Sequence, residues 1–159
     1  MLFRSAAVPT VWLGLLQHME ANGLKLPHLK KVVIGGSAVP ERVLRAFEVD
    51  YGVEVYHAWG MTETNPLGTL ARVKENLGPL DDDARLAVSA TQGYAVPFVD
   101  VRHADDQGKV LPWDGQTMGE LEVRGPWVAA GYLGGEGAEK FTADGWFKTG
   151  DVEIGRAHV

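Results

Sequence analysis

The sequence has no cysteine among its 159 residues. That absence excludes disulfides, thiolate catalysis and cysteine-based zinc sites. Apolar runs are also short, and none approaches the roughly 20 residues that a membrane-spanning helix requires. No secretory signal is visible at the beginning of the chain. These absences lead us to expect a cytoplasmic protein without a transmembrane segment.

Positive charge is scarce as well. The chain carries 15 lysines and arginines against 21 aspartates and glutamates, which gives a net charge of -6. A general nucleic-acid binder needs a basic stripe that neutralises phosphates, and the sequence offers none. The five histidines lie far apart and show no metal-ligand spacing. We therefore expect small-molecule partners and no nucleic acid, while the sequence leaves the oligomeric state open.

The first half of the chain shows an α/β pattern. Helical spacing of apolar residues predicts helices over 11–21 and 40–51. Short β-branched runs predict buried strands over 31–34 and 53–56. The first helix is predicted from Val11, Leu15, Leu16 and Met19. The order helix, strand, helix, strand indicates a parallel sheet with right-handed crossovers.

The second half is richer in β-structure. Residues 99–102 and 121–124 alternate apolar and polar side chains, and 105–108 predict a turn. The acidic triplet at 81–83 is interpreted as a solvated loop or a helix start rather than a metal site. The expected fold class is therefore α/β followed by a β-rich part with short antiparallel strands.

The two ends of the sequence resemble a sequencing adapter. Back-translation of 153–159 contains a common adapter sequence, and 1–5, read from a GTG start, encode the reverse complement of its first bases. Two matches in opposite orientation favour an adapter origin over a natural tail, which is the alternative. The protein's own residues are then expected to form an α/β piece at 6–80 and a β-rich part at 81–152.

Two loops after predicted strands carry residues suited to a flat ligand. Ligands bind at strand-end loops of an open parallel sheet. Gly35, Gly36 and Gly60 let the main chain approach a ligand closely, because they lack a Cβ atom. Trp59 offers an aromatic face on which a purine can stack. The competing interpretation is that the glycines form turns and that Trp59 belongs to a core.

Thr62 and Glu63 follow Trp59 closely and could serve a phosphate group. Thr62 has a hydroxyl donor for a phosphate oxygen. Glu63 has a hard oxygen ligand for Mg²⁺, which binds few protein carboxylates together with substrate phosphates. A solvated surface glutamate is the alternative for Glu63. From spacing alone, a nucleotide site and a set of turn and surface residues both remain open.

Four motifs resemble, in order, those of the superfamily of acyl-CoA synthetases, nonribosomal adenylation domains and firefly luciferase. Residues 55–63 are similar to its Tyr-Gly-x-Thr-Glu signature, and 35–38 to its adenine loop. Residues 119–132 resemble its Gly-Glu-Leu, Arg-Gly and Gly-Tyr motif, and 145–151 its aromatic-(Arg/Lys)-Thr-Gly-Asp motif. Finer features resemble bacterial medium- and long-chain fatty acyl-CoA ligases and methylmercaptopropionyl-CoA ligases.

The resemblance implies an ATP- and AMP-binding site in which Thr62 and Glu63 are catalytic. Trp59 would stack on the adenine, Thr62 would contact the α-phosphate, and Glu63 would hold Mg²⁺. Asp151 would accept hydrogen bonds from the ribose hydroxyls, as a carboxylate at a loop tip can. The implied nucleotide contacts are Gly36, Ser37, Ala38, His57, Ala58, Trp59, Gly60, Met61, Thr62 and Asp151.

The resemblance also implies an acyl pocket bordered by Gly35, Gly60 and Met61, and in the functional interpretation Trp12 contributes to this pocket. Core packing of its helix is the favoured alternative for Trp12. His57 has a similar alternative, because a histidine beside the adenine and a packing histidine are equally compatible with its position in the motif.

The implied reaction joins a fatty acid or a related carboxylic acid to CoA, with ATP and Mg²⁺, through an acyl-adenylate. The family's upstream phosphate loop and its C-terminal catalytic lysine have no counterpart in this sequence. The chain is therefore interpreted as an internal fragment of the large N-terminal domain, with a piece of the parallel-sheet subdomain and a small distorted β-barrel, and inactive alone. The alternatives are a stand-alone nucleotide-binding or interaction module, or an amino-acid-activating or luciferase-like enzyme.

Overall fold

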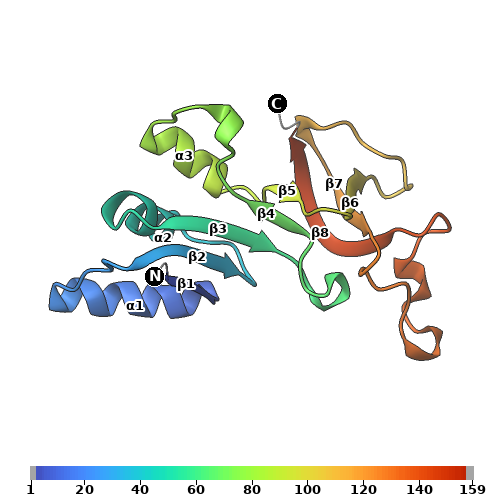
Figure 1. Ribbon diagram of the computed structural model, residues 1–159. Coiled ribbons are helices and arrows are strands. Elements are labelled where there is room, and N and C mark those ends of the chain that lie inside the picture. The colour runs from blue at the N-terminus through green and yellow to red at the C-terminus, as the bar shows by residue number, and fades with distance from the viewer. Residues whose placement is uncertain (1–2, 157–159) are drawn as a thin grey trace. The chain divides into compact units, whose positions relative to one another are not determined.

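The computed structural model describes residues 3–156. The chain forms two units (Figure 1), which are described separately. The first contains the residues up to Met61 together with Leu67–Tyr94, and the second contains Thr62–Pro66 together with the residues from Ala95 onward. The expected order, an α/β part followed by a β-rich part, is confirmed.

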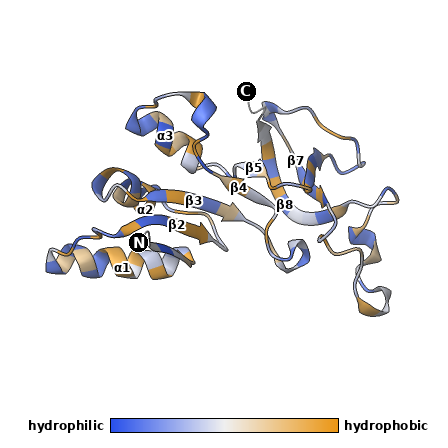
Figure 2. Ribbon diagram, viewed as in Figure 1, coloured by the Kyte–Doolittle hydropathy of each residue, from blue (hydrophilic) through white to orange (hydrophobic). Residues whose placement is uncertain are grey.

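A sheet with the strand order β1-β2-β3-β4-β5 organises the first unit. Its strands are β1 (Phe3–Ala7), β2 (Leu29–Gly35), β3 (Glu54–Trp59), β4 (Thr69–Ala71) and the short β5 (Tyr94–Ala95). The first three strands are mutually parallel, as predicted, whereas β4 pairs with β3 in the antiparallel direction. The sheet is therefore mixed rather than purely parallel. Figure 2 shows apolar and polar stretches in turn along β2, β3 and α1.

Three α-helices accompany this sheet: α1 (Pro9–Asn22), α2 (Glu41–Arg45) and α3 (Asp82–Ser89). A π-helical turn, Ala46–Asp50, extends α2, so the helix predicted over 40–51 changes its winding halfway. Helix α1 ends at Gly23, whose φ of 63° is the left-handed geometry that glycine adopts easily. In residues 3–156 no helix has the length and apolarity needed to cross a membrane.

The core of the first unit lies where α1 and α2 meet the sheet. Trp12 packs edge-on against Phe47 with ring centroids 5.2 Å apart. The fully buried members of this core include Val32, Ile34, Val43, Leu44, Phe47 and Val53. The prediction for α1 needs one correction, because Val11 is 57% exposed and Trp12 is buried instead. The buried residues Trp12, Leu16 and Met19 follow the 3.6-residue period more closely than the predicted set.

Helix α3 begins at the acidic triplet. The carboxylate of Asp81 accepts a hydrogen bond from the Ala84 backbone N–H at 2.8 Å, which is a standard N-cap. At its other end, the hydroxyl of the buried Ser89 donates to Glu48 at 2.8 Å. The Ser89 bond ties α3 to the unit that includes Leu67–Tyr94. The expected boundary at residue 80 lies within that unit, and the predicted division stays a prediction.

The second unit is built on an antiparallel sheet with the order β6-β7-β8. Its strands are β6 (Asp100–Ala104), β7 (Asp114–Arg124) and β8 (Phe147–Arg156). The predicted turn after β6 is present, with the Gly108 backbone N–H donating to the Asp105 carbonyl at 2.9 Å. Short 3-10 turns complete the chain at Thr62–Thr64, Glu75–Leu77, Leu133–Gly135 and Ala138–Lys140.

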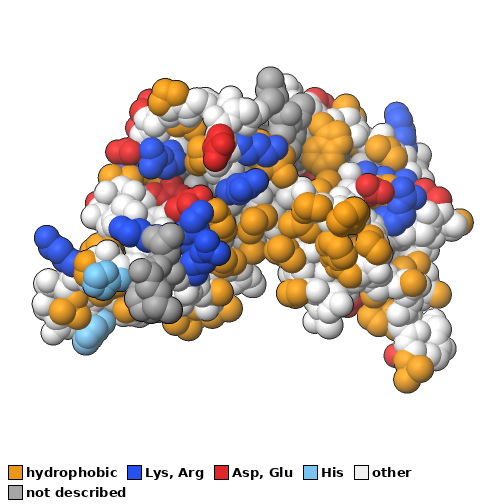
Figure 3. Space-filling view, viewed as in Figure 1, with side chains coloured by type: hydrophobic (Ala, Val, Ile, Leu, Met, Phe, Trp, Pro, Cys, Tyr) orange, Lys and Arg blue, Asp and Glu red, His pale blue; other side chains and the backbone are white. Residues whose placement is uncertain are grey.

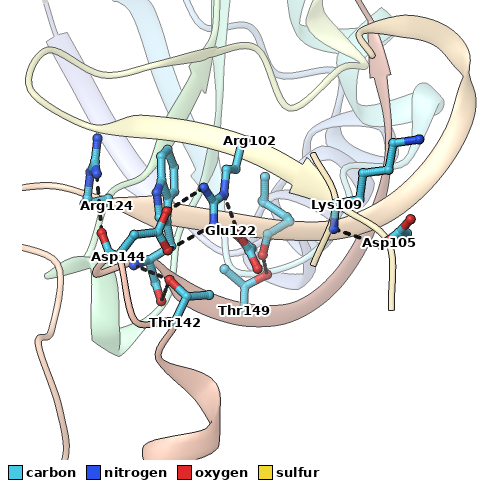
Figure 4. A network of polar contacts seen from close by, with 10 residues as sticks. Arg102, Asp105, Lys109, Glu122, Arg124, Thr142, Asp144 and Thr149 are labelled. Carbon is cyan, nitrogen blue, oxygen red and sulfur yellow. Dashed lines mark hydrogen bonds and ion pairs between the residues drawn. The ribbon is translucent and has the colours of Figure 1, made fainter. Parts of the chain in front are cut away.

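A buried ion pair joins β6 to β7. Arg102 contacts Glu122 at 2.5 Å and the exposed Asp144 at 3.0 Å, as Figure 4 shows. The guanidinium of Arg102 also lies 4.3 Å from the ring centroid of Trp146. Glu122 is only 1% exposed. The charge of Glu122 is thus compensated where water cannot reach it, as buried charges require.

The predicted adapter-derived ends overlap regular structure in part. Residues 3–5 lie in β1 and 153–156 lie in β8, whereas 1–2 and 157–159 lie outside the described residues. The adapter origin of both ends stays a prediction.

Candidate nucleotide site

The first group of candidate residues gathers at the carboxyl ends of β2 and β3. The last paired residues of these parallel strands are Gly35 and Ala58. Gly36 and Trp59 each follow by one residue, so the glycine loop and the tryptophan leave neighbouring strands at the same edge of the sheet. This is the edge at which open α/β sheets bind ligands.

Close packing explains the glycines at this edge. A Cβ on Gly35 would lie 2.8 Å from the Ala58 carbonyl oxygen, so a side chain would separate β2 from β3. Gly36 has a φ of 92°, which L-residues rarely adopt. Close approach at Gly35 is thus an approach between two strands, and the predicted approach of this main chain to a flat ligand stays a prediction. Ser37 and Ala38, the next two residues of the loop, are exposed.

Trp59 is half-buried and rests on the β3–β4 turn. Its indole ring occupies the space that a Cβ on Gly68 would need, and the Gly68 backbone N–H donates to the Trp59 carbonyl at 3.0 Å. Because Gly68 has no side chain, the indole of Trp59 can pack directly against the main chain there. The sequence interpretation missed Gly68, although a glycine between two apolar segments is a signal for close approach.

His57 has a different environment. Its side chain is 2% exposed, and its Nδ1 lies 3.3 Å from the Ser89 carbonyl oxygen in α3. Burial lowers the pKa of His57, so the neutral ring is favoured. Within residues 3–156 its Nε2 has no hydrogen-bond partner. This environment is compatible with the packing alternative for His57, and its place beside the adenine stays a prediction.

Trp12 likewise lies in the core, where its Nε1 donates to the Ala7 carbonyl at 3.1 Å. The one hydrogen-bond donor of the Trp12 side chain thus has a main-chain partner just before α1. This environment fits the core-packing alternative for Trp12. Ala58, Gly60 and Met61 are half-buried. Gly60 and Met61 connect β3 to the segment that carries Thr62.

The second group of candidate residues belongs to the second unit. Thr62 is exposed and begins the 3-10 turn Thr62–Thr64. The Glu63 backbone carbonyl accepts a hydrogen bond from the Ala129 N–H at 2.7 Å. The Glu63 carboxylate accepts one from the Tyr132 hydroxyl at 2.5 Å. The Tyr132 bond lowers the pKa of Glu63, so its carboxylate is charged at neutral pH.

Tyr132 is the residue that sequence reasoning overlooked. The Gly-Tyr motif marked its position, but no role was assigned to it. Its contact with Glu63 spans 69 positions of the chain. No local periodicity encodes a pairing of that range, and only the phenol's capacity to donate to a carboxylate hinted at it.

Asp151 lies within β8 rather than at the loop tip that the sequence suggested. Opposite Leu121, the β7–β8 register shifts so that 149–151 bulge from the ladder. The Thr149 hydroxyl donates to the Leu121 carbonyl at 2.8 Å, and the Asp151 N–H donates to that hydroxyl at 3.1 Å. The bulge exposes the Asp151 side chain on a strand whose backbone is fixed.

Comparison with known proteins gives a consistent family. Residues 5–133 match the sequence profile described as AMP-binding enzyme. The chain is 41% identical over 152 residues to a long-chain-fatty-acid–CoA ligase of Thermus thermophilus, which covers 94% of this chain and 28% of that protein. It is 43% identical over 145 residues to a 3-methylmercaptopropionyl-CoA ligase of Ruegeria pomeroyi, covering 91% and 27%.

Solved structures agree. An ATP-bound chimera of RpMatB and BxBclM has a TM-score of 0.72 and 31% identity, covering 94% of this chain and 28% of that chain. The resemblance to bacterial fatty acyl-CoA and methylmercaptopropionyl-CoA ligases is thereby confirmed. The chain spans little more than a quarter of the length of these proteins.

Proposed function

Because the chain belongs to the family of AMP-binding enzymes, we propose that it is the nucleotide-binding part of an ATP-dependent carboxylate–CoA ligase. The observation that carries the proposal is the parallel register of Gly35 with Ala58, which brings Gly36 and Trp59 out at neighbouring strand ends. The ligase names of the relatives from Thermus and Ruegeria support the reaction class. A cytoplasmic location, where ATP and CoA are available, is part of this proposal.

The proposed reaction has two steps. A carboxylate oxygen of a fatty acid or related acid attacks the α-phosphorus of ATP, and pyrophosphate leaves as the acyl-adenylate forms. The CoA sulfur then attacks the acyl carbon, its proton is lost to solvent, and AMP leaves. No side-chain nucleophile takes part, so a chain without cysteine can perform it. The protein contributes positioning and charge stabilisation at phosphorus.

Each candidate residue has a task in this scheme. Trp59 stacks on the adenine, while the loop 36–38 lies along its edge. Thr62 donates its hydroxyl to the α-phosphate, and Asp151 accepts hydrogen bonds from the ribose hydroxyls. Gly35, Gly60 and Met61 border the acyl group. The buried positions of His57 and Trp12 favour packing roles for those two side chains.

Mg²⁺ would be held by Glu63. Among residues 3–156 there is no cluster of three or more His, Asp or Glu side chains that could bind a metal ion. A single charged carboxylate nevertheless fits Mg²⁺, because this ion keeps several waters and usually binds one or two carboxylates plus the substrate's phosphates. The ion would neutralise phosphate charge when bound. The chain's own part is to keep the Glu63 carboxylate ionised and fixed.

Nucleotide affinity tests the adenine half of this proposal. We expect the 159-residue chain to bind AMP by calorimetry, Trp59→Tyr to retain binding, and Trp59→Leu to weaken it about 5- to 150-fold, since base–aromatic stacking contributes about 1–3 kcal/mol. Trp127→Leu is the matched control, because Trp127 contacts Phe98 in the second unit and has no assigned task. Equal losses in both leucine variants, or no AMP binding by the unaltered chain, would contradict the assignment.

Ligase chemistry needs a second readout. Residues 6–152 can replace the matching segment of the Thermus thermophilus relative, and the hybrid can be assayed for acid-dependent exchange between ATP and pyrophosphate. We expect exchange with fatty acids and its loss in the hybrid carrying Trp59→Leu. AMP binding by the chain together with an inert but folded hybrid would favour a nucleotide-binding module without chemistry.

A further inference from the structure

The carboxylate of Glu63 is held from the far end of the second unit's sequence. Tyr132 donates its hydroxyl to Glu63 Oε1 at 2.5 Å, and Ala129 donates its N–H to the Glu63 carbonyl at 2.7 Å. Both the side chain and the main chain of Glu63 are thus bound by the same short segment, 129–132. The main-chain bond fixes the backbone of Glu63, and the side-chain bond fixes the direction of its carboxylate.

The ring of Tyr132 is itself held in place. It makes edge contacts with Phe141 and Phe147, with ring centroids 5.8 and 6.5 Å apart. A Cβ on Gly137 would lie 3.1 Å from its Cδ2, so the chain passes close beside it. The Lys140 ammonium lies 5.9 Å from its centroid. A half-buried ring with these neighbours gives its hydroxyl one direction, toward Glu63.

The hydrogen bond joins a phenol donor to a carboxylate acceptor. Tyr132 donates its hydroxyl to Glu63 Oε1 at 2.5 Å, which is the short distance typical of a charge-assisted bond. Such bonds are stronger than bonds between neutral groups.

We propose that Tyr132 is a positioning residue, which occupies Glu63 Oε1 and so presents Oε2 to a divalent cation carried by the phosphates of the bound nucleotide. This inference rests on the proposed function and adds to it the device that orients the metal-binding carboxylate. Hydrogen-bond partners of metal-binding side chains set both the orientation and the affinity of the site.

The test compares two tyrosine-to-phenylalanine variants of the 159-residue chain. Tyr132→Phe keeps the ring packing and removes the donor. Tyr56→Phe is the control, because the Tyr56 hydroxyl accepts a hydrogen bond from Lys31 at 2.7 Å in the first unit and does not contact Glu63. Binding of AMP without metal, of ATP without metal and of ATP with Mg²⁺ is measured by calorimetry.

We expect Tyr132→Phe to weaken the binding of Mg²⁺ in the presence of ATP by about 10- to 100-fold, the usual cost of losing such a partner. Metal-free AMP affinity should not change. Tyr56→Phe should change none of these quantities. In a chain that already carries Glu63→Gln, Tyr132→Phe should have no further effect on Mg²⁺ affinity, because the two residues act as one unit.

Two results would overturn the inference. One is an unchanged Mg²⁺ affinity in Tyr132→Phe, and the other is an equal loss of metal-free AMP and metal-bound ATP affinity, which would mark a purely structural tyrosine. Both results leave the proposed function intact, since the unaltered chain still binds AMP. Failure of the unaltered chain to bind AMP would overturn the proposed function itself and this inference with it.

Discussion

The two units bury a glutamate in opposite ways. In the first, Glu48 is buried beside α3 and accepts a hydrogen bond from the Ser89 hydroxyl at 2.8 Å. Burial outweighs that bond and raises the pKa of Glu48. In the second, Glu122 is buried against the guanidinium of Arg102 at 2.5 Å. One unit tolerates a carboxylate at the margin of an apolar core, and the other builds its interior around a compensated charge.

This difference extends to the rest of each interior. Apolar side chains from α1, α2, β2 and β3 form one continuous core in the first unit. In the second, two arginines, Arg102 and Arg124, lie over Trp146 at 4.3 and 4.6 Å from its ring centroid. Figure 3 shows acidic and basic side chains interspersed on the visible face of the first unit, so that face carries no continuous basic stripe. The first unit should therefore respond most to lost volume, and the second to lost charge.

Lost volume is tested most strongly at Phe47. We expect Phe47→Ala to destabilise the first unit by about 3–5 kcal/mol, because it leaves a cavity beside Trp12 that the core cannot fill. Urea unfolding gives the free energy, and hydrogen exchange by mass spectrometry assigns the loss to a unit. Val11→Ala is the control, since Val11 is exposed, and should stay within about 0.5 kcal/mol. An equal loss of protection in the second unit would show that the units do not differ as argued.

Lost charge is tested at Arg102. We expect Arg102→Met to cost the second unit about 3 kcal/mol, because it leaves Glu122 buried without its partner. Arg124→Met is the matched control: it removes an arginine from the same tryptophan, but Arg124 pairs with Asp100 at 3.0 Å in an exposed position. An exposed pair contributes about 0–1 kcal/mol. Unfolding by urea, read through exchange in β6 and β7, measures both.

Removing both partners of the buried ion pair tests the same argument. In a chain with both Arg102→Met and Glu122→Met, the second unit should recover most of the lost stability, since buried ion pairs can be replaced by apolar residues at little cost. If the single variant Arg102→Met costs no more than Arg124→Met, the interior of the second unit does not depend on the buried pair.

The same contrast explains what the sequence could predict. Local periods placed α1, β2 and β3, and glycine marked the end of α1 at Gly23. Val53, Val55 and His57 are buried at every second position just before and along β3. This alternation places His57 on the buried face of the strand, and the sequence prediction did not use it. The three-residue strand β4 was too short for any period to reveal.

The second unit depends on pairings that no period encodes. Arg102 meets Asp144 across 42 positions, and Tyr132 meets Glu63 across 69. The motif around Asp151 was interpreted as a loop, because Gly150 and Thr149 suit turns, whereas the structure continues β8 through it as a bulge. Strand ends and residue chemistry pointed to the glycines, Trp59, Thr62 and Glu63, and the resemblance added Asp151 and the tasks, which stay predictions. The contact that orients Glu63 required coordinates.

The smallest expected effect is the pH dependence that the buried Glu48 gives the first unit. The pKa of Glu48 is raised in the folded state, so the folded protein binds this proton more tightly than the unfolded chain does. Its contribution to stability therefore improves as pH falls from neutrality through the folded pKa, and ionised Glu48 is a cost above it. We expect Glu48→Gln to stabilise the first unit at pH 7 by about 1 kcal/mol or less, and to lose that advantage in acid. Glu75→Gln, at an exposed position, should show no such pH dependence. Thermal unfolding between pH 5 and 8 measures both variants, and a constant difference between Glu48→Gln and the unaltered chain across that range would mean that Glu48 pays no cost for its burial.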